Sequence, residues 1–119
     1  MVEDSESLRR VLAEKLQDEG FEVLEAAGGE AGFAIAHEQK PNMIITDIVM
    51  FPVDGLEMAK KIRESGTWGA EVHIITLTNS ADENERVRSL HLTAYLIKAE
   101  TSLDEVVKQV KSILKKKKK

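Results

Sequence analysis

The segment NMIITDIVMFPVDG, residues 42–55, decides the fold class. Its hydrophobic run from Met43 to Thr46 is typical of a strand that is buried on both faces of a sheet. The run ends in a single carboxylate, Asp47, and a loop with Pro52 and an Asp-Gly pair follows. Ligands of parallel α/β sheets bind at the carboxyl ends of the strands. We therefore expect Asp47 to belong to a functional site.

On both sides of this segment, helical and strand patterns alternate along the chain. Helical spacing of apolar residues covers 8–16, 31–36, 56–62 and 103–114, and Gly20 and Pro41 follow the first two as stop signals. Short apolar runs predict strands at 21–24, 72–77 and 94–97, and a loop around Trp68 lies between Gly66 and Gly69. Capping-box patterns open helices at Asp54, Ser80 and Ser102. The alternation predicts βα crossovers, a mostly parallel sheet and helices on both of its faces.

Composition limits the protein to one domain and excludes several classes. The 119 residues suffice for one core, which we place at residues 1–114, followed by a lysine tail at 115–119. The tail contributes a charge of +5, so residues 1–114 carry a net charge of −9. This negative charge argues against direct nucleic-acid binding. Cysteine is absent, and the three histidines have no ligand spacing, so thiolate and histidine metal sites are not expected. No apolar run approaches membrane-spanning length and no signal pattern is present, so we expect a cytoplasmic protein without membrane contact.

Polar residues gather at the expected strand ends. Glu3 and Asp4 precede the first helix, Asp47 ends its strand, and Thr78 and Lys98 end the two later strands. Taken singly, each residue has a structural explanation, such as helix capping for Asp4. Taken together, three carboxylates need a counter-charge, which Mg²⁺, a cation that prefers oxygen ligands, and the lysine would supply. Such a set suits phosphoryl transfer, with the aspartate as a candidate nucleophile.

These residues carry a family resemblance that covers nearly the whole chain. The stretches VEDSESLRRVL, PNMIITDIVM, DGLEMAKKIR, HIITLTN and AYLIK resemble the receiver domain of response regulators in two-component signalling. The resemblance implies a flavodoxin-like, doubly wound parallel sheet with strand order 2-1-3-4-5. It implies that Asp47 is the phospho-acceptor and that Mg²⁺ is held by Glu3, Asp4, Asp47 and the backbone carbonyl of Val49. It also implies that Thr78 is the switch hydroxyl, that Lys98 pairs with a phosphoryl oxygen, and that Tyr95 is the switch aromatic.

The resemblance also implies partners. A sensor histidine kinase or a phosphotransfer protein would present a phosphohistidine to Asp47, and a downstream protein would read the face made by the last strand and helix. The domain would remove its own phosphoryl group slowly, so it is a signalling switch rather than a metabolic enzyme. No DNA-binding module is present in these 119 residues.

The sequence departs from the family pattern in two main places. Only Met1 and Val2 precede Glu3, where the family has a full central strand. Truncation, a strand supplied by another chain through swapping or dimerisation, and a changed strand order are three competing explanations. In addition, Ala99 follows Lys98 where the family usually has proline, so the bond between them is expected to be trans.

Three other functions compete with a phospho-accepting receiver. A receiver-like interaction module would keep the fold and bind a protein without phosphate switching; the five retained site positions favour the receiver over it. An aspartate-dependent phosphohydrolase would have a second acid two residues after the nucleophile, where this chain has Val49. A flavin carrier would need a glycine-rich phosphate loop after the first strand, where EDSESLRR is too acidic.

Overall fold

Three parallel strands form the regular sheet. The computed structural model describes residues 1–3, 5–47, 54–78, 94–97 and 101–117. Within them, β1 (Met43–Asp47), β2 (His73–Thr78) and β3 (Ala94–Ile97) pair in the order β1-β2-β3. The predicted strands at 72–77 and 94–97, and the strand that delivers Asp47, are confirmed within one residue at their ends. All pairs are parallel, as the alternation of helices and strands predicts.

The amino terminus takes the central position of a longer sheet. Val2 forms parallel bridges with Ala26 on one side and with Thr46 of β1 on the other. Its N–H donates to the carbonyl oxygen of Ile45 at 2.7 Å, and its carbonyl oxygen accepts from the N–H of Asp47 at 3.0 Å. The order is therefore Ala26, Val2, β1, β2, β3, which is the 2-1-3-4-5 order. Residues 1–3 themselves supply the end of the central strand, so the described fold needs neither a changed order nor a swapped strand.

The prediction of a strand at Phe21–Leu24 is wrong. These residues have no regular strand structure, and their segment contacts the centre of the sheet through the bridge at Ala26 and through the Leu24 carbonyl oxygen, which accepts from the Met1 ammonium. The reason is that the pairing segment, residues 1–3, is short. A strand is maintained by a continuous ladder of hydrogen bonds, and these three residues provide only the last bonds of that ladder.

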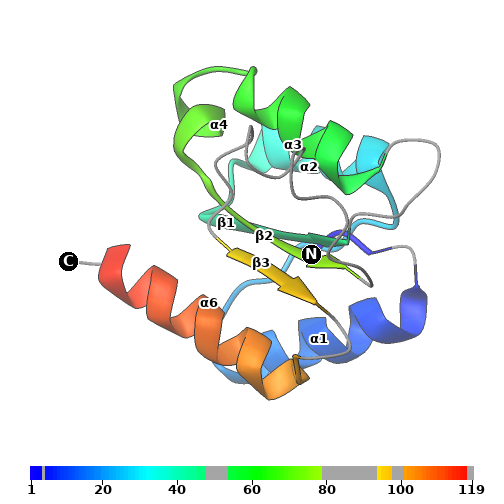
Figure 1. The fold of residues 1–119 in the computed structure, drawn as a ribbon, viewed down its shortest axis with the longest axis vertical. Coiled ribbons are helices and arrows are strands. Elements are labelled where there is room, and N and C mark those ends of the chain that lie inside the picture. Colours follow the sequence, from blue (N-terminus) through cyan, green and yellow to red (C-terminus); the bar gives the residue numbers. More distant parts are fainter. Residues whose placement is uncertain (4, 48–53, 79–93, 98–100, 118–119) are drawn as a thin grey trace.

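Helices cover both faces of the sheet (Figure 1). The helices α1 (Glu6–Asp18) and α6 (Leu103–Lys117) lie on one face. The helices α2 (Gly29–Gln39), α3 (Gly55–Arg63) and α4 (Thr67–Glu71) lie on the other. Each layer has its own apolar core: Ile44, Ile74, Leu56, Met58 and Ile62 are central to the α2–α3 layer, and Leu12, Leu16, Ile75, Val106 and Val110 to the α1–α6 layer. The doubly wound architecture is thereby confirmed.

Side-chain caps fix the starts of three helices. Ser5 accepts from the N–H of Leu8, and Asp54 accepts from the N–H of Glu57 at 2.8 Å. At α6 the predicted capping box is complete, because the N–H of Glu105 donates to Ser102 and the N–H of Ser102 donates to the Glu105 carboxylate. The predicted box at Ser80 lies outside the described residues. The helix α6 continues to Lys117, so the first three lysines of the expected tail extend it.

A short helix stands where the loop around Trp68 was expected. A Cβ at Gly69 would overlap the carbonyl oxygen of Ile62, so α4 packs closely against the end of α3. Arg63 donates to the carbonyl oxygens of Gly69 and Val72 at 2.8 and 2.7 Å, and Trp68 donates to that of Pro41 at 3.1 Å. The two bonds from Arg63 satisfy carbonyl groups that a five-residue helix leaves open at its end, and the bond from Trp68 ties the helix to Pro41. Of the helices in the described ranges, none combines the length and apolarity needed to cross a membrane.

Candidate functional site

Asp47 lies buried at the carboxyl end of β1. Only 5% of the surface of Asp47 is exposed, although the residue carries a carboxylate. Its N–H donates to the carbonyl oxygen of Val2, and its own carbonyl oxygen accepts from the hydroxyl of Thr46 at 2.8 Å. On the opposite side the chain enters α3, where a Cβ at Gly55 would overlap the Asp47 carbonyl oxygen. The backbone that carries the acid is therefore held by the central strand, by a neighbouring side chain and by the start of α3.

Glu3 is buried beside it, at the end of the short central strand. The residue is 1% exposed, and its N–H donates to the carbonyl oxygen of Ala26 at 3.0 Å. Its carboxylate accepts from the N–H of Ser5, the N-cap of α1, at 3.0 Å. A terminal segment usually frays, but this one is anchored on both sides of its backbone.

Arg9 is a site residue that the sequence reasoning missed. Its Nη1 donates to the carbonyl oxygen of Glu3 at 2.9 Å, and its Nε pairs with the carboxylate of Glu25 at 3.2 Å. The side chain thus joins α1 to the end of the central strand. The only sequence signal was a basic residue six positions after Glu3, and such residues are common on exposed helix faces.

Glu3 and Asp47 are neighbours across the sheet. Val2 lies opposite Thr46, so the next residues, Glu3 and Asp47, come opposite one another. Adjacent strands lie about 4.8 Å apart, and residues in register point to the same face. The two carboxylates therefore belong to the same edge of the sheet. Oxygen donors of this kind suit a hard divalent cation such as Mg²⁺.

The other predicted site residues are placed in part. Thr78 is the last residue of β2, at the same edge of the sheet as Asp47, and Tyr95 lies in β3 opposite Thr76. Asp4, Val49 and Lys98 lie outside the described residues. Within the described part of the chain, no three histidine, cysteine, aspartate or glutamate side chains form a group that could hold a metal. The described acids at this edge are Glu3 and Asp47, and the third predicted acid is Asp4.

Comparison with known proteins identifies the family. The model of the response regulator receiver domain matches residues 1–111. The transcriptional regulatory protein SrrA of Staphylococcus aureus is 33% identical over 97% of this chain and 46% of its own length. The probable transcriptional regulator ycf27 of Porphyridium aerugineum is 31% identical over 97% of this chain and 47% of its own. The chain therefore spans about half the length of these two relatives.

Solved structures agree with this assignment. The response regulator TrrA of Thermotoga maritima, in complex with Mg²⁺ and BeF, is 31% identical, and the alignment covers 93% of both chains with a TM-score of 0.80. The chemotaxis protein CheY4 of Vibrio cholerae is 28% identical and covers 93% of this chain and 92% of its own, with a TM-score of 0.84. With its parallel sheet, its two helical layers and its acid at the end of β1, this chain belongs to the response regulator receiver domain family of two-component systems.

Proposed function

We propose that Asp47 is the phospho-acceptor of this receiver domain. The observation that carries the proposal is the pairing of two buried acids, Glu3 and Asp47, on neighbouring strands at the carboxyl edge of the sheet. The carboxyl ends of parallel strands are the edge at which α/β sheets bind their ligands. A site for a divalent cation and a phosphoryl group accounts for both acids at once.

Glu3, Asp4, Asp47 and the carbonyl oxygen of Val49 would hold Mg²⁺. Receiver domains generally bind Mg²⁺ for phosphorylation. When bound, the ion neutralises charge that develops on the phosphoryl oxygens. Glu3 suits this role because Ala26 and Arg9 hold its backbone and the Ser5 N–H donates to its carboxylate.

The chain's own residues would carry the transfer. One carboxylate oxygen of Asp47 attacks the phosphorus of a phosphohistidine in line, forming a P–O bond while the P–N bond breaks and the imidazole leaves. Lys98 pairs with a phosphoryl oxygen. The new dianion attracts the hydroxyl of Thr78 at the end of β2, and this change biases Tyr95 in the neighbouring strand β3. Water later hydrolyses the acyl phosphate slowly and restores Asp47.

Receiver domains interact with histidine kinases and with downstream effectors. For this chain the proposed donor is a sensor histidine kinase or a phosphotransfer protein in the cytoplasm, and the proposed output face is formed by β3 and α6. The two relatives described above carry names of transcriptional regulators. Because residues 1–114 carry −9, we propose that this domain acts on a protein and not on nucleic acid directly.

Intact mass spectrometry after incubation with acetyl phosphate and Mg²⁺ tests the proposal. We expect one added phosphoryl group, which is absent when Mg²⁺ is chelated and absent in Asp47→Asn. Asp104→Asn, which removes an exposed acid on α6, is the matched control and should still gain the group. If a chain shown to be folded by circular dichroism gains nothing, the phospho-acceptor proposal fails and an interaction module without phosphate switching becomes the better interpretation.

A further inference from the structure

Two neighbouring arginines of α1 have different surroundings. The side chain of Arg9 is only 13% exposed, whereas Arg10, the next residue of the helix, is exposed. Arginine side chains of folded proteins are mostly exposed, and those that are buried are paired. The fold therefore gives Arg9 a fixed place, and the groups that it contacts indicate what this place is for.

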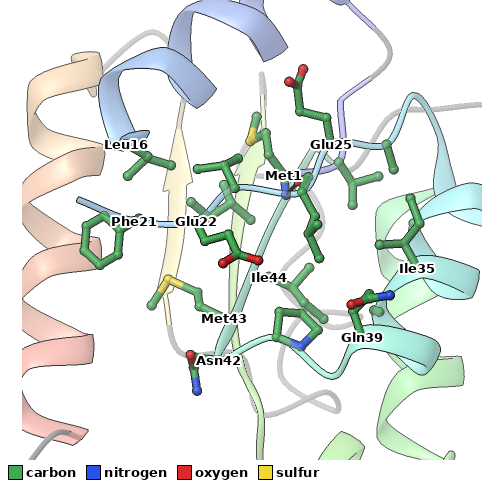
Figure 2. A pocket seen from close by; sticks show the side chains of 18 of the residues that line it. Met1, Leu16, Phe21, Glu22, Glu25, Ile35, Gln39, Asn42, Met43 and Ile44 are labelled. Atoms are coloured by element: carbon green, nitrogen blue, oxygen red, sulfur yellow. Dashed lines mark hydrogen bonds between the residues drawn. The ribbon is translucent and has the colours of Figure 1, made fainter. Parts of the chain in front are cut away.

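The guanidinium group of Arg9 joins three segments of the chain. Its Nη1 donates to the carbonyl oxygen of Glu3 at 2.9 Å, and its Nε donates to the carboxylate of Glu25 at 3.2 Å. Figure 2 shows the Glu25 side chain directed away from the pocket that Ile35 and Ile44 line. Because the guanidinium is planar and its donors have a fixed geometry, α1, the end of the central strand and the segment before α2 are held in one arrangement.

The carbonyl oxygen that accepts from Arg9 belongs to the peptide unit between Glu3 and Asp4, two of the acids proposed as Mg²⁺ ligands. A peptide unit is planar, so a hydrogen bond to its oxygen restrains the rotation of the whole unit. Residues that hold metal ligands in place without contacting the ion change the metal affinity by about ten- to a hundredfold when they are replaced. The contact of Arg9 is therefore made at a point where it can affect metal binding.

We propose that Arg9 is a positioning residue of the Mg²⁺ site, which orients Glu3 and the peptide unit that follows it before the ion binds. The inference rests on the proposed function, because it takes Glu3 as a ligand of the ion. The pairing with Glu25 suits this role, since the carboxylate offsets the guanidinium charge, which would otherwise repel a cation. Arg9 thus reaches the backbone of one ligand without adding an uncompensated positive charge.

Positioning and charge alone predict opposite effects on Mg²⁺ affinity. If only the charge of Arg9 acted on the site, its removal would strengthen the binding of a cation. If Arg9 orients a ligand, its removal weakens that binding. Arg10→Gln removes the same charge from the adjacent, exposed position of α1, so it measures the effect of the charge without the contact to Glu3.

Calorimetric titration with MgCl₂ gives the dissociation constant, and the amide NMR signals of Glu3 and Asp47 report binding at the site itself. We expect Arg9→Gln to bind Mg²⁺ at least about tenfold more weakly than the parent chain. Arg10→Gln should bind with the parental affinity or slightly more tightly. Arg9→Lys keeps the charge and lacks the planar fork that bonds to both partners, so it should also bind more weakly than the parent.

Arg63 provides the control for a loss of stability without a loss of positioning. It donates to the carbonyl oxygens of Gly69 and Val72, at the opposite end of α3 from Gly55, where the helix approaches Asp47. Arg63→Gln should lower the free energy of unfolding and leave the Mg²⁺ affinity of the folded chain unchanged. Each titration is made at a temperature at which circular dichroism shows that the variant is folded.

Parental Mg²⁺ affinity in Arg9→Gln, or in Arg9→Lys if the glutamine variant does not fold, would overturn the inference about Arg9 alone. Tighter binding by Arg9→Gln would also overturn it, because the guanidinium would then act only through its charge. Failure of the proposed function has a different result. A parent chain that binds no Mg²⁺, or a Glu3→Gln chain that binds it as well as the parent, would contradict the ligand role of Glu3, and the inference would fail with it.

Discussion

Glu3 is the neighbour of Asp47 across the sheet because Val2, the residue before Glu3, pairs with Thr46, the residue before Asp47. Three residues of central strand are thus enough to bring a second buried acid beside the first. The end of this strand therefore lies beside the carboxyl end of β1, where Asp47 is found. The shortened first strand is therefore compatible with the chemistry of the family.

Removal of the Glu3 charge should separate metal binding from folding. For the parent chain, Mg²⁺ at 100 times its dissociation constant should raise the free energy of unfolding by about 2.7 kcal/mol. Glu3→Gln should lose most of this gain, because it removes a carboxylate ligand, while its amide oxygen can still accept from the Ser5 N–H. Thermal unfolding with and without Mg²⁺ measures both effects. Glu14→Gln, an exposed site on α1, is the control, and an undiminished Mg²⁺ effect in Glu3→Gln would contradict the proposed ligand role.

Two buried threonines in register should respond in opposite ways to the same substitution. Thr46 and Thr76 lie opposite one another and are both 0% exposed. The Thr46 hydroxyl donates to the Asp47 carbonyl oxygen, whereas the Thr76 hydroxyl has no hydrogen-bond partner in the described part of the chain. Valine keeps the shape and removes the hydroxyl. Thr46→Val should lower the free energy of unfolding by about 1 kcal/mol, and Thr76→Val should raise it by about 1 kcal/mol.

Urea denaturation of the two variants provides the comparison, and each serves as the control for the other. Equal changes of the same sign would mean that the hydrogen bond of Thr46 does not decide the difference. The slope of unfolding free energy against urea should stay constant, since neither substitution changes the surface exposed on unfolding.

Gly55→Ala should damage the backbone of the site. The new Cβ would overlap the carbonyl oxygen of Asp47, which is backbone and cannot rotate away. Overpacking of this kind costs about 3 kcal/mol, or forces α3 away from β1. Gly20→Ala is a control with a different cost, because Gly20 has φ of 96° and no atom within 4 Å of an added Cβ. There the expected loss is about 1–2 kcal/mol, from the left-handed backbone alone.

Chemical denaturation gives both losses, and the acetyl phosphate assay shows whether the site survives. Gly55→Ala should slow phosphorylation even at temperatures where the variant is folded, while Gly20→Ala should leave the rate unchanged. If the Gly55→Ala chain had the parental free energy of unfolding and the parental phosphorylation rate, close packing of α3 against the Asp47 backbone would not be needed for the site.

The amino group of Met1 should make stability depend on pH. Burial lowers the pKa of this amine from 8.0 to about 6, and the charge of Glu25 opposes the shift. Between pH 6 and 8 the unfolded chain therefore binds more protons than the folded one, so the free energy of unfolding should rise with pH across this window. A shift of two pKa units corresponds to a gain in the free energy of unfolding of at most about 2.7 kcal/mol across this window.

Acetylation of the amino terminus removes this titration and keeps an N–H that can donate to Leu24. Urea denaturation at pH 6 and pH 8 should show the pH-dependent gain in the free chain and its loss in the acetylated chain. All other ionisable groups are the same in both proteins, so their contributions cancel in the comparison. An identical pH dependence in both chains would rule out the buried amine as its source.

The local elements and their order follow from the amino-acid sequence alone. Helical periodicity and capping residues act within a few positions of the chain, so the spacing of Ser102 and Glu105 is enough to assign them to the start of α6. Likewise, a continuous apolar run that ends in Asp47 identifies a buried strand and the edge at which its acid lies. The resemblance to receiver domains rests on such local patterns, and the family comparison confirms it.

The use of the shortened first strand, in contrast, depends on tertiary contacts. A three-residue segment has no periodicity to interpret, and its place depends on hydrogen bonds to Ala26 and Ile45, which are distant in sequence. The same missing partner explains why Phe21–Leu24 is not a regular strand, although its composition favours one. Arg9 could not be assigned either, because its contact with Glu3 exists only once α1 packs beside the central strand. Pairing between distant segments is set by the whole fold, and it is this pairing that places Glu3 beside Asp47.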